Sequence, residues 1–265
     1  MLRVTLLGTG SSAGVPMIGG PDGGGDWGVC DPHEPRNRRT RASIVVEGAA
    51  GKRLLVDTSP DMRNQLLAGR IPGVDAIVFT HAHVDHITGL DDVRILNRIA
   101  GSPLDVYATR ATLEELRRRF DYAFRPWVPP GFFRPVLKEH VVEPEDRVDA
   151  AGLELLFFKQ DHGYVDTLGI RIGGFAYSTD VVGLDETAFA ALGGVDTWVV
   201  GCFQRIEPHK THAHLTLALR WAARVAARRT VLTHMGTDMD WAWLCANLPA
   251  GIEPGYDGLV LEVPE

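Results

Sequence analysis

A short segment that follows an apolar run carries four side chains able to bind divalent metals. Residues 76–79 are apolar, and residues 80–86 then read Thr-His-Ala-His-Val-Asp-His. Imidazole and carboxylate groups suit a hard or borderline divalent ion. The H-x-H-x-D-H spacing is too tight for one helix face and is typical of a loop that wraps a metal. The segment therefore predicts a metal site.

Four other short apolar runs also end on metal-binding side chains. The side chains that follow these runs are those of Asp57, Asp161, His162, Asp180 and His234. A lone histidine after a strand is usually a solvated or hydrogen-bonded loop residue. The recurrence of the pattern changes this interpretation, because strand ends that converge on one edge of a sheet can together supply the ligands of one metal site. Together the five stretches are typical of a two-metal hydrolase.

Asp57 has two interpretations, because it lies in the sequence Asp-Thr-Ser-Pro. Its carboxylate can form an Asx-type turn before the following helix. Alternatively, it can accept a hydrogen bond from a ligand histidine and orient that ring toward a metal. We retain the second role as the prediction.

The composition is that of an ordinary soluble enzyme. With 265 residues, of which 45% are hydrophobic, the chain can bury one large core, and we expect a single domain over residues 1–265. No apolar stretch approaches the roughly 20 residues of a membrane span. The apolar run at residues 2–7 is too short for a secretory signal, so we expect a cytoplasmic protein without membrane contact.

The cysteine content restricts the disulfides that the chain can form, and its charge restricts the partners that it can bind. Three cysteines cannot build a disulfide framework, and whether Cys30 contributes to an extra metal site or is a plain loop cysteine stays open. A net charge of −7 gives no indication of a general nucleic-acid-binding surface. The arginines of residues 36–41 are candidates for an anionic substrate, because guanidinium groups pair with phosphate. Those of residues 117–119 are expected on the solvated face of a helix that Thr112 opens.

The pattern of apolar runs predicts alternating strands and helices. A helix is expected from Ser59 and Pro60 to about Ala68, and another from about Thr216, where apolar and arginine positions lie on different faces. Strands are expected at residues 2–7, 43–47, 53–57, 75–80, 104–108, 153–159, 168–172, 174–179, 197–202, 230–233 and 258–263.

The combined motifs resemble the metallo-β-lactamase fold over essentially the whole chain. The resemblance rests on Leu-Leu-Gly-Thr-Gly at residues 6–10, on the H-x-H-x-D-H segment and on Leu-Thr-His at residues 232–234. It implies an α/β fold, a four-layer αββα sandwich with the metal site along one edge of two facing sheets. It also implies a ligand set: His81, His83 and His162 for one metal, Asp85, His86 and His234 for the other, and Asp180 bridging both.

Within this fold the sequence resembles the phosphodiesterases. Residues 8–16 and 211–216 are similar to those of phosphoribosyl 1,2-cyclic phosphate phosphodiesterases, with tRNase Z a more distant relative. The resemblance implies a metal-dependent hydrolase that attacks a small, cyclic phosphodiester with a metal-bridging hydroxide. Some members carry a structural zinc on an N-terminal cysteine cluster, of which only Cys30 is present here.

Phosphodiester hydrolysis also needs a proton for the leaving oxygen. His212 and His214 precede the helix that begins near Thr216, and either can be the general acid, with Asp85 as a further proton source. His33, His140 and His209 have no strand-end placement, and we interpret them as surface residues.

Two divalent ions are expected, zinc or manganese before nickel or iron, because His and Asp sites accept all four. The expected partner is a small phosphorylated substrate, nucleic acid is not expected, and a homodimer is left open. Two other functions remain to be compared: an RNA-processing nuclease of the tRNase Z kind, and a catalytically silent metal-binding protein on the same fold. The acidic chain has no long Gly- and Lys-rich arm to bind RNA, which disfavours the nuclease.

Overall fold

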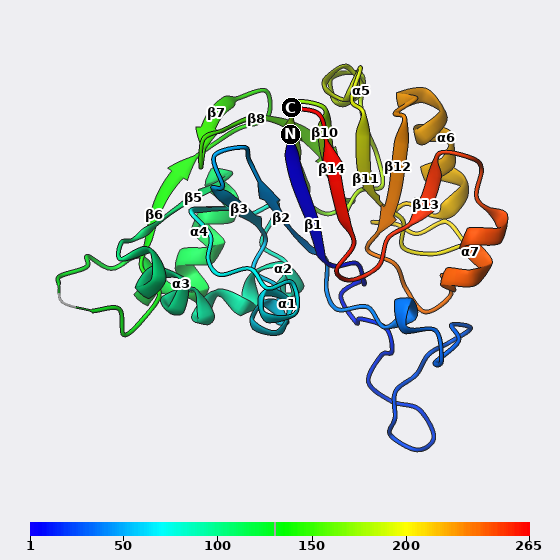
Figure 1. The fold of residues 1–265 in the computed structure, drawn as a ribbon, viewed down its shortest axis with the longest axis horizontal. Coiled ribbons are helices and arrows are strands. Elements are labelled where there is room, and N and C mark those ends of the chain that lie inside the picture. Colours follow the sequence, from blue (N-terminus) through cyan, green and yellow to red (C-terminus); the bar gives the residue numbers. More distant parts are fainter. Residues whose placement is uncertain (130) are drawn as a thin grey trace.

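The apolar runs of the sequence form two seven-stranded sheets that pack face to face in the computed structural model, which describes residues 1–129 and 131–265 (Figure 1). The first sheet has the order β14-β1-β2-β3-β4-β5-β6. Its strands are β14 (Val260–Val263), β1 (Leu2–Gly8), β2 (Ser43–Glu47), β3 (Arg53–Val56), β4 (Ala76–Val78), β5 (Leu104–Ala108) and β6 (Leu137–Val141). Strands β3 to β6 are parallel neighbours, and the other pairs are antiparallel.

The second sheet repeats this plan with the order β13-β12-β11-β10-β9-β8-β7. Its strands are β13 (Ile252–Pro254), β12 (Arg229–Thr233), β11 (Thr197–Gly201), β10 (Phe175–Ser178), β9 (Asp166–Ile172), β8 (Leu153–Asp161) and β7 (Arg147–Ala150). Strands β10 to β13 are parallel, and β7 to β10 form antiparallel pairs. Strands β8, β10 and β12 therefore run in the same direction.

Helices cover the outer face of each sheet, on opposite sides of the molecule in Figure 1. The first sheet is covered by α1 (Met62–Ala68), α2 (Val84–Ile87), α3 (Val93–Ala100) and α4 (Arg110–Arg119). The second is covered by α5 (Glu186–Leu192), α6 (Leu215–Val225) and α7 (Trp241–Asn247). Short 3-10 helices lie at Pro35–Asn37, Thr88–Asp92 and Asp121–Phe124.

The strand alternation produces three apolar layers. In β4, Ala76 and Val78 point into the core between the sheets, whereas Ile77 packs under the helices. In β8, Phe157 joins the same central core and Phe158 faces the helices of the second sheet. Successive strand residues point to opposite faces, so a sheet covered on both sides needs a continuous apolar run. The expected four-layer αββα sandwich of the metallo-β-lactamase fold is confirmed.

Three strands are missing from the sequence prediction, and all three lie at sheet edges. They are β6, β7 and β13, of which β6 and β7 each have only one fully buried residue. An edge strand packs on fewer neighbours, so its sequence carries no long apolar run. Among the described residues, no helix has the length and hydropathy required to cross a bilayer.

Two predicted helix starts were wrong by a few residues. Helix α1 begins at Met62 with Asp61 as its N-cap, because Pro60 lies in the preceding turn. Helix α4 begins at Arg110, where Thr109 Oγ1 accepts a hydrogen bond from Thr112 N at 3.2 Å. Thr112 is therefore the residue being capped.

Candidate metal centre

The predicted ligands lie at one end of the sandwich because the strands that precede them end there. His81 and His83 follow β4, and His162, Asp180 and His234 follow β8, β10 and β12. The last three strands run in the same direction, so their carboxyl ends share one edge. The chain direction of the second sheet thus brings together three residues that are far apart in the sequence.

The side chains at this end form three overlapping groups of candidate ligand atoms among the described residues. Within each group the atoms lie within 4.8 Å of one another. The first group is His81, His83, His162 and Asp180, the second is Asp85, His86 and His234, and the third is Asp180, His212 and His234. The first two groups contain the ligand sets that the family resemblance implies, and the third adds His212.

Asp180 lies between the first and second groups. Its Oδ1 is 3.6 Å from His162 Nε2 in the first group. Its Oδ2 is 3.1 Å from His86 Nε2 and 3.3 Å from His234 Nε2 in the second. One carboxylate oxygen thus faces each group, which is the arrangement that a bridging ligand requires.

Several of these atoms are buried without a hydrogen-bond partner, which tests whether the residues fit metals. Within residues 1–129 and 131–265, His81 Nε2, His86 Nε2 and both ring nitrogens of His234 have no hydrogen bond. A buried unsatisfied polar group costs about 1–3 kcal/mol. Imidazole nitrogens around a buried carboxylate are a donor set for divalent ions, so the residues fit a two-metal site.

The charges of the cluster favour a cation. Burial lowers the pKa of His81 well below its usual value and lowers that of His83, which keeps their rings neutral. Burial alone would raise the pKa of Asp180, but His234 and His86 hold it well below its usual range. Burial alone would lower the pKa of His86, but Asp180 and Asp85 raise it well above the usual value. Ionised carboxylates at the centre therefore attract positive charge, which a divalent ion would supply.

Asp57 is fully buried and contacts the ligand loop. Its Oδ2 is 2.7 Å from His86 Nδ1, and it accepts hydrogen bonds from Thr80 N and Thr80 Oγ1, both at 2.8 Å. The predicted role of orienting a ligand ring matches this geometry. Asp57, Asp180 and His234 have φ values of 63°, 51° and 55°. Such left-handed backbone is uncommon in residues other than glycine and often marks functional loops.

His212 and His214 have different surroundings. The ring of His212 stacks on that of His234 at 4.8 Å, and its Nδ1 is 3.7 Å from Asp180 Oδ1. His214 is the N-cap residue of α6 without a side-chain capping hydrogen bond, and within the part of the chain that the structure describes it belongs to none of the candidate ligand groups. Burial lowers the pKa of His212 to about 3, and His234 acts in the same direction. An anionic group bound beside the ring would raise the pKa of His212.

The structure adds positioning contacts that the sequence did not predict. The Thr211 carbonyl lies 2.6 Å from His162 Nδ1, and Arg119 Nη1 donates to the Ala82 carbonyl at 3.2 Å. Arg119 thus contacts the ligand loop and does more than occupy a solvated helix face. A main-chain contact such as that of Thr211 has no residue-type signal from which it could be predicted.

Asp257 joins the N-terminal glycine loop to the segment that contains Thr40. It accepts hydrogen bonds from Thr9 N at 2.9 Å and Thr40 N at 2.7 Å, and burial raises its pKa to about 6. The loop pairs with Met235 through Gly10, next to His234. A Cβ on Gly10 would lie 2.9 Å from the Arg39 carbonyl, so this glycine permits close packing of two main-chain segments.

The basic segment at residues 36–41 and Cys30 form a structural network. Arg39 is buried and donates to the Met239 carbonyl at 2.7 Å, and its Nη1 lies 3.9 Å from Cys30 Sγ. Arg41 pairs with Asp61 at 3.2 Å. Cys30 is in none of the candidate metal-ligand groups among the described residues.

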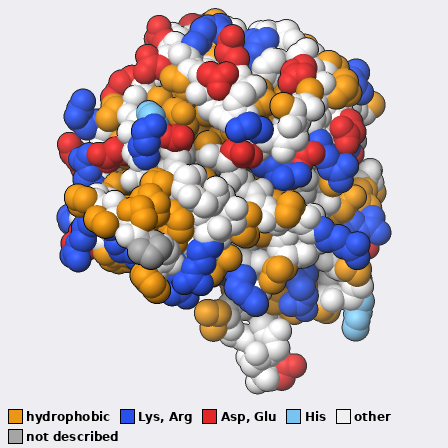
Figure 2. Space-filling view, turned by 60° about the vertical axis from the view of Figure 1, so that its left-hand side comes forward, with side chains coloured by type: hydrophobic (Ala, Val, Ile, Leu, Met, Phe, Trp, Pro, Cys, Tyr) orange, Lys and Arg blue, Asp and Glu red, His pale blue; other side chains and the backbone are white. Residues whose placement is uncertain are grey.

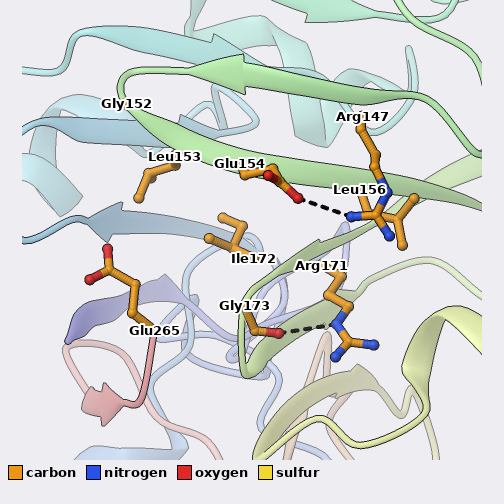
Figure 3. Close-up of a pocket in the computed structure, with 9 residues that line it drawn as sticks. All are labelled: Arg147, Gly152, Leu153, Glu154, Leu156, Arg171, Ile172, Gly173 and Glu265. Carbon is orange, nitrogen blue, oxygen red and sulfur yellow. Dashed lines mark hydrogen bonds and ion pairs between the residues drawn. The ribbon is translucent and has the colours of Figure 1, made fainter.

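The cavity drawn in Figure 3 lies away from these ligands. It has a volume of about 510 Å³ and is lined by side chains of β7, β8 and β9 and by Glu265. The chain termini meet at this end, where the Met1 amino group donates to Glu265 Oε2 at 3.1 Å. The cavity contains none of the predicted ligands.

Comparisons with known proteins agree with the fold and the site. A model described as the beta-lactamase superfamily domain matches residues 52–235. A solved diphosphatase from the PhnP family has a TM-score of 0.88 and 35% identity, covering 100% of this chain and 98% of that one. The chain belongs to the beta-lactamase superfamily and, within it, to the PhnP family. The resemblance drawn from the motifs and the class of metal-dependent hydrolase are confirmed.

Two curated relatives differ in length. An octanoyltransferase from Porphyromonas gingivalis is 32% identical over 265 residues, which cover 100% of this chain and 52% of the relative. The chain thus spans about half the length of that relative. A ribonuclease Z from Mycolicibacterium paratuberculosis is 28% identical over 297 residues, which cover 97% of this chain and 96% of the relative.

Proposed function

We propose that the protein is a dinuclear metal-dependent phosphodiesterase that hydrolyses a small phosphodiester, such as phosphoribosyl 1,2-cyclic phosphate. The observation that carries the proposal is Asp180, with one carboxylate oxygen toward each group of candidate ligands. In this proposal His81, His83 and His162 hold one ion, and Asp85, His86 and His234 hold the other. Zinc and manganese are the first candidates for both.

The metal ions and the protein side chains would make different contributions to the reaction. Divalent ions held by these residues would supply a hydroxide nucleophile at neutral pH and would neutralise charge on the phosphoryl oxygens. Asp57 holds the His86 ring through Nδ1, so that Nε2 points toward the centre. The Thr211 carbonyl does the same for His162 through Nδ1. These contacts orient the rings before any ligand binds, which avoids reorganisation during the reaction.

His212 is the proposed proton donor to the leaving oxygen. Its ring borders Asp180 and His234, so a phosphodiester at the centre would lie within reach of its ring nitrogens. His214 is the N-cap residue of α6 and is in none of the candidate ligand groups among the described residues, which makes it the less suitable of the two. General acid catalysis typically contributes 10²- to 10⁴-fold.

The surface charge supports an anionic substrate at the ligand end. On the face in Figure 2, Asp and Glu side chains lie mainly in the upper part, among Lys and Arg side chains, whereas most charged side chains in the lower part, toward the ligand end of the sandwich, are Lys or Arg. The net charge of the chain is nevertheless −7. A local basic area on an acidic protein suits a small anion better than a long polyanion.

The test is turnover of three substrates by one preparation with a measured metal content. We expect about two divalent ions per chain, and faster hydrolysis of phosphoribosyl 1,2-cyclic phosphate and bis(p-nitrophenyl) phosphate than of precursor tRNA. Efficient cleavage at a tRNA 3′ trailer would favour the nuclease instead. A protein that holds both ions but hydrolyses none of the three would be the silent metal-binding protein.

A further inference from the structure

Three aromatic rings contact one another in the segment that joins β11 to α6. The ring centroids of Phe203 and His209 are 5.1 Å apart, those of Phe203 and His212 are 5.2 Å apart, and those of His209 and His212 are 5.1 Å apart. These separations lie within the range of favourable aromatic contacts. The three residues therefore form one aromatic cluster.

The aromatic cluster leads from the candidate ligands to solvent. His212 is its inner member, with its ring centroid 4.7 Å from that of His162 and 4.8 Å from that of His234. Phe203 is half-buried, and His209 is exposed. A molecule bound at the metal centre could thus reach Phe203 and His209 without any rearrangement of the core.

The outer rings of the cluster are held in place. His209 Nδ1 accepts hydrogen bonds from Thr211 N at 3.3 Å and from Thr211 Oγ1 at 3.2 Å. Phe203 packs over Gly236, where a Cβ would lie 3.2 Å from the phenyl ring. Rings that are already ordered lose less conformational freedom when a planar group stacks on them.

The charge beside the rings adds a second recognition element. Lys210 follows His209 and is exposed, so the chain carries a cation next to the outer ring of the cluster. A planar group, an anionic phosphate and a reacting phosphorus are combined in nucleotides. Stacking of nucleobases on aromatic side chains is a common way of binding them.

We propose that Phe203 and His209 form a stacking subsite for the base of a nucleoside phosphodiester whose phosphorus lies at the metal centre. The proposal rests on the proposed phosphodiesterase function and restricts its substrates to nucleoside phosphodiesters. The simpler interpretation is that the rings only stabilise their own segment. Under that interpretation, replacing His209 would not change the preference for substrates that carry a base over substrates that do not.

The experiment compares two substrates with the same leaving group. Thymidine 5′-(p-nitrophenyl phosphate) carries a base, and methyl p-nitrophenyl phosphate does not. We expect the ratio of their kcat/KM values to fall roughly tenfold in His209→Ala, because stacking on one ring is lost. His209→Phe keeps an aromatic face and should retain most of the ratio. His33→Ala, which removes an exposed imidazole outside the cluster, is the matched control and should leave the ratio unchanged.

A binding measurement separates this proposal from the proposed function. Calorimetric titration with thymidine 5′-monophosphate should show binding to the wild type and roughly tenfold weaker binding to His209→Ala. If neither substrate is hydrolysed but His209→Ala still binds the nucleotide more weakly than the wild type, the phosphodiesterase function is refuted and the stacking subsite is retained. Equal substrate ratios and equal affinities in wild type, His209→Ala and His209→Phe would refute the subsite, as would a wild type that does not bind the nucleotide.

Discussion

The two ends of the sandwich differ in the burial and hydrogen bonding of their polar groups. At the ligand end, His81, His86 and His234 are buried with ring nitrogens that lack hydrogen bonds among the described residues. At the end with the termini, charged groups pair in solvent, as Arg147 and Glu154 do at 3.0 Å with 63% and 76% of their side chains exposed. Unsatisfied buried groups cost stability, whereas exposed pairs change it little. The ligand end thus keeps an arrangement that folding alone does not favour.

Backbone strain shows the same contrast. Left-handed φ values occur at both ends, but at the ligand end they fall on buried polar residues such as Asp57 and Asp180. At the other end Ala151 has a φ of 55° in the solvent-facing turn between β7 and β8. A turn explains Ala151, whereas the buried residues need the surrounding structure to hold them. Function is therefore the better explanation for the ligand end.

The largest expected effect comes from removing the residue between the two ligand groups. Asp180→Ala should lower hydrolysis more than about 100-fold, beyond the loss typical of a residue that only supports a ligand. His83→Ala should do the same at the exposed edge of the site. Both should lower metal content while circular dichroism shows a retained fold. Full activity in either variant would remove that residue from the ligand set.

The next effect separates His212 from His214. His212→Ala should lower kcat/KM by about 10²- to 10⁴-fold on an alkyl or ribosyl phosphodiester, because that leaving group needs a proton. A p-nitrophenyl ester should be much less affected, and metal content should not change. His214→Ala is the control on the same segment. If neither variant loses activity selectively on the poor leaving group, a metal-bound water or Asp85 becomes the proton source.

A smaller effect is expected from the carboxylate behind the ligands. Asp57→Asn keeps the size of the side chain but removes the charge next to His86 Nδ1. Metal affinity should fall about 10- to 100-fold, as is typical when the partner of a ligand histidine is lost. Competition with a fluorescent chelator measures this affinity. Unaltered affinity would indicate that Asp57 serves only the turn before α1.

The smallest effect is expected at the opposite end. Glu154→Gln breaks the exposed pair with Arg147 beside the cavity in Figure 3. The melting temperature should change by less than about 2 °C, because exposed pairs contribute little. Hydrolysis should stay at the wild-type rate. A large loss of activity would mean that the two ends are coupled, and the contrast between them would have to be abandoned.

Much of the fold could be predicted because buried strands need apolar runs. The central strands β1, β4, β8 and β12 were each expected from such runs, and the structure contains them. The edge strands β6, β7 and β13 were missed because fewer of their side chains have to be apolar. Local hydrogen bonding moved the starts of α1 and α4 by a few residues.

Sequence alone determined the apolar pattern of the sheets and the dense H-x-H-x-D-H segment, because residues so close along the chain must also be close in space. It also supplied the single histidines and carboxylates at strand ends. Only the tertiary structure decided which of them meet, because His162, Asp180 and His234 come from strands whose common direction is set by sheet pairing. The same holds for His212 beside Asp180 and for His209 in the aromatic cluster. Their roles depend on through-space contacts of a folded segment, which residue spacing does not encode.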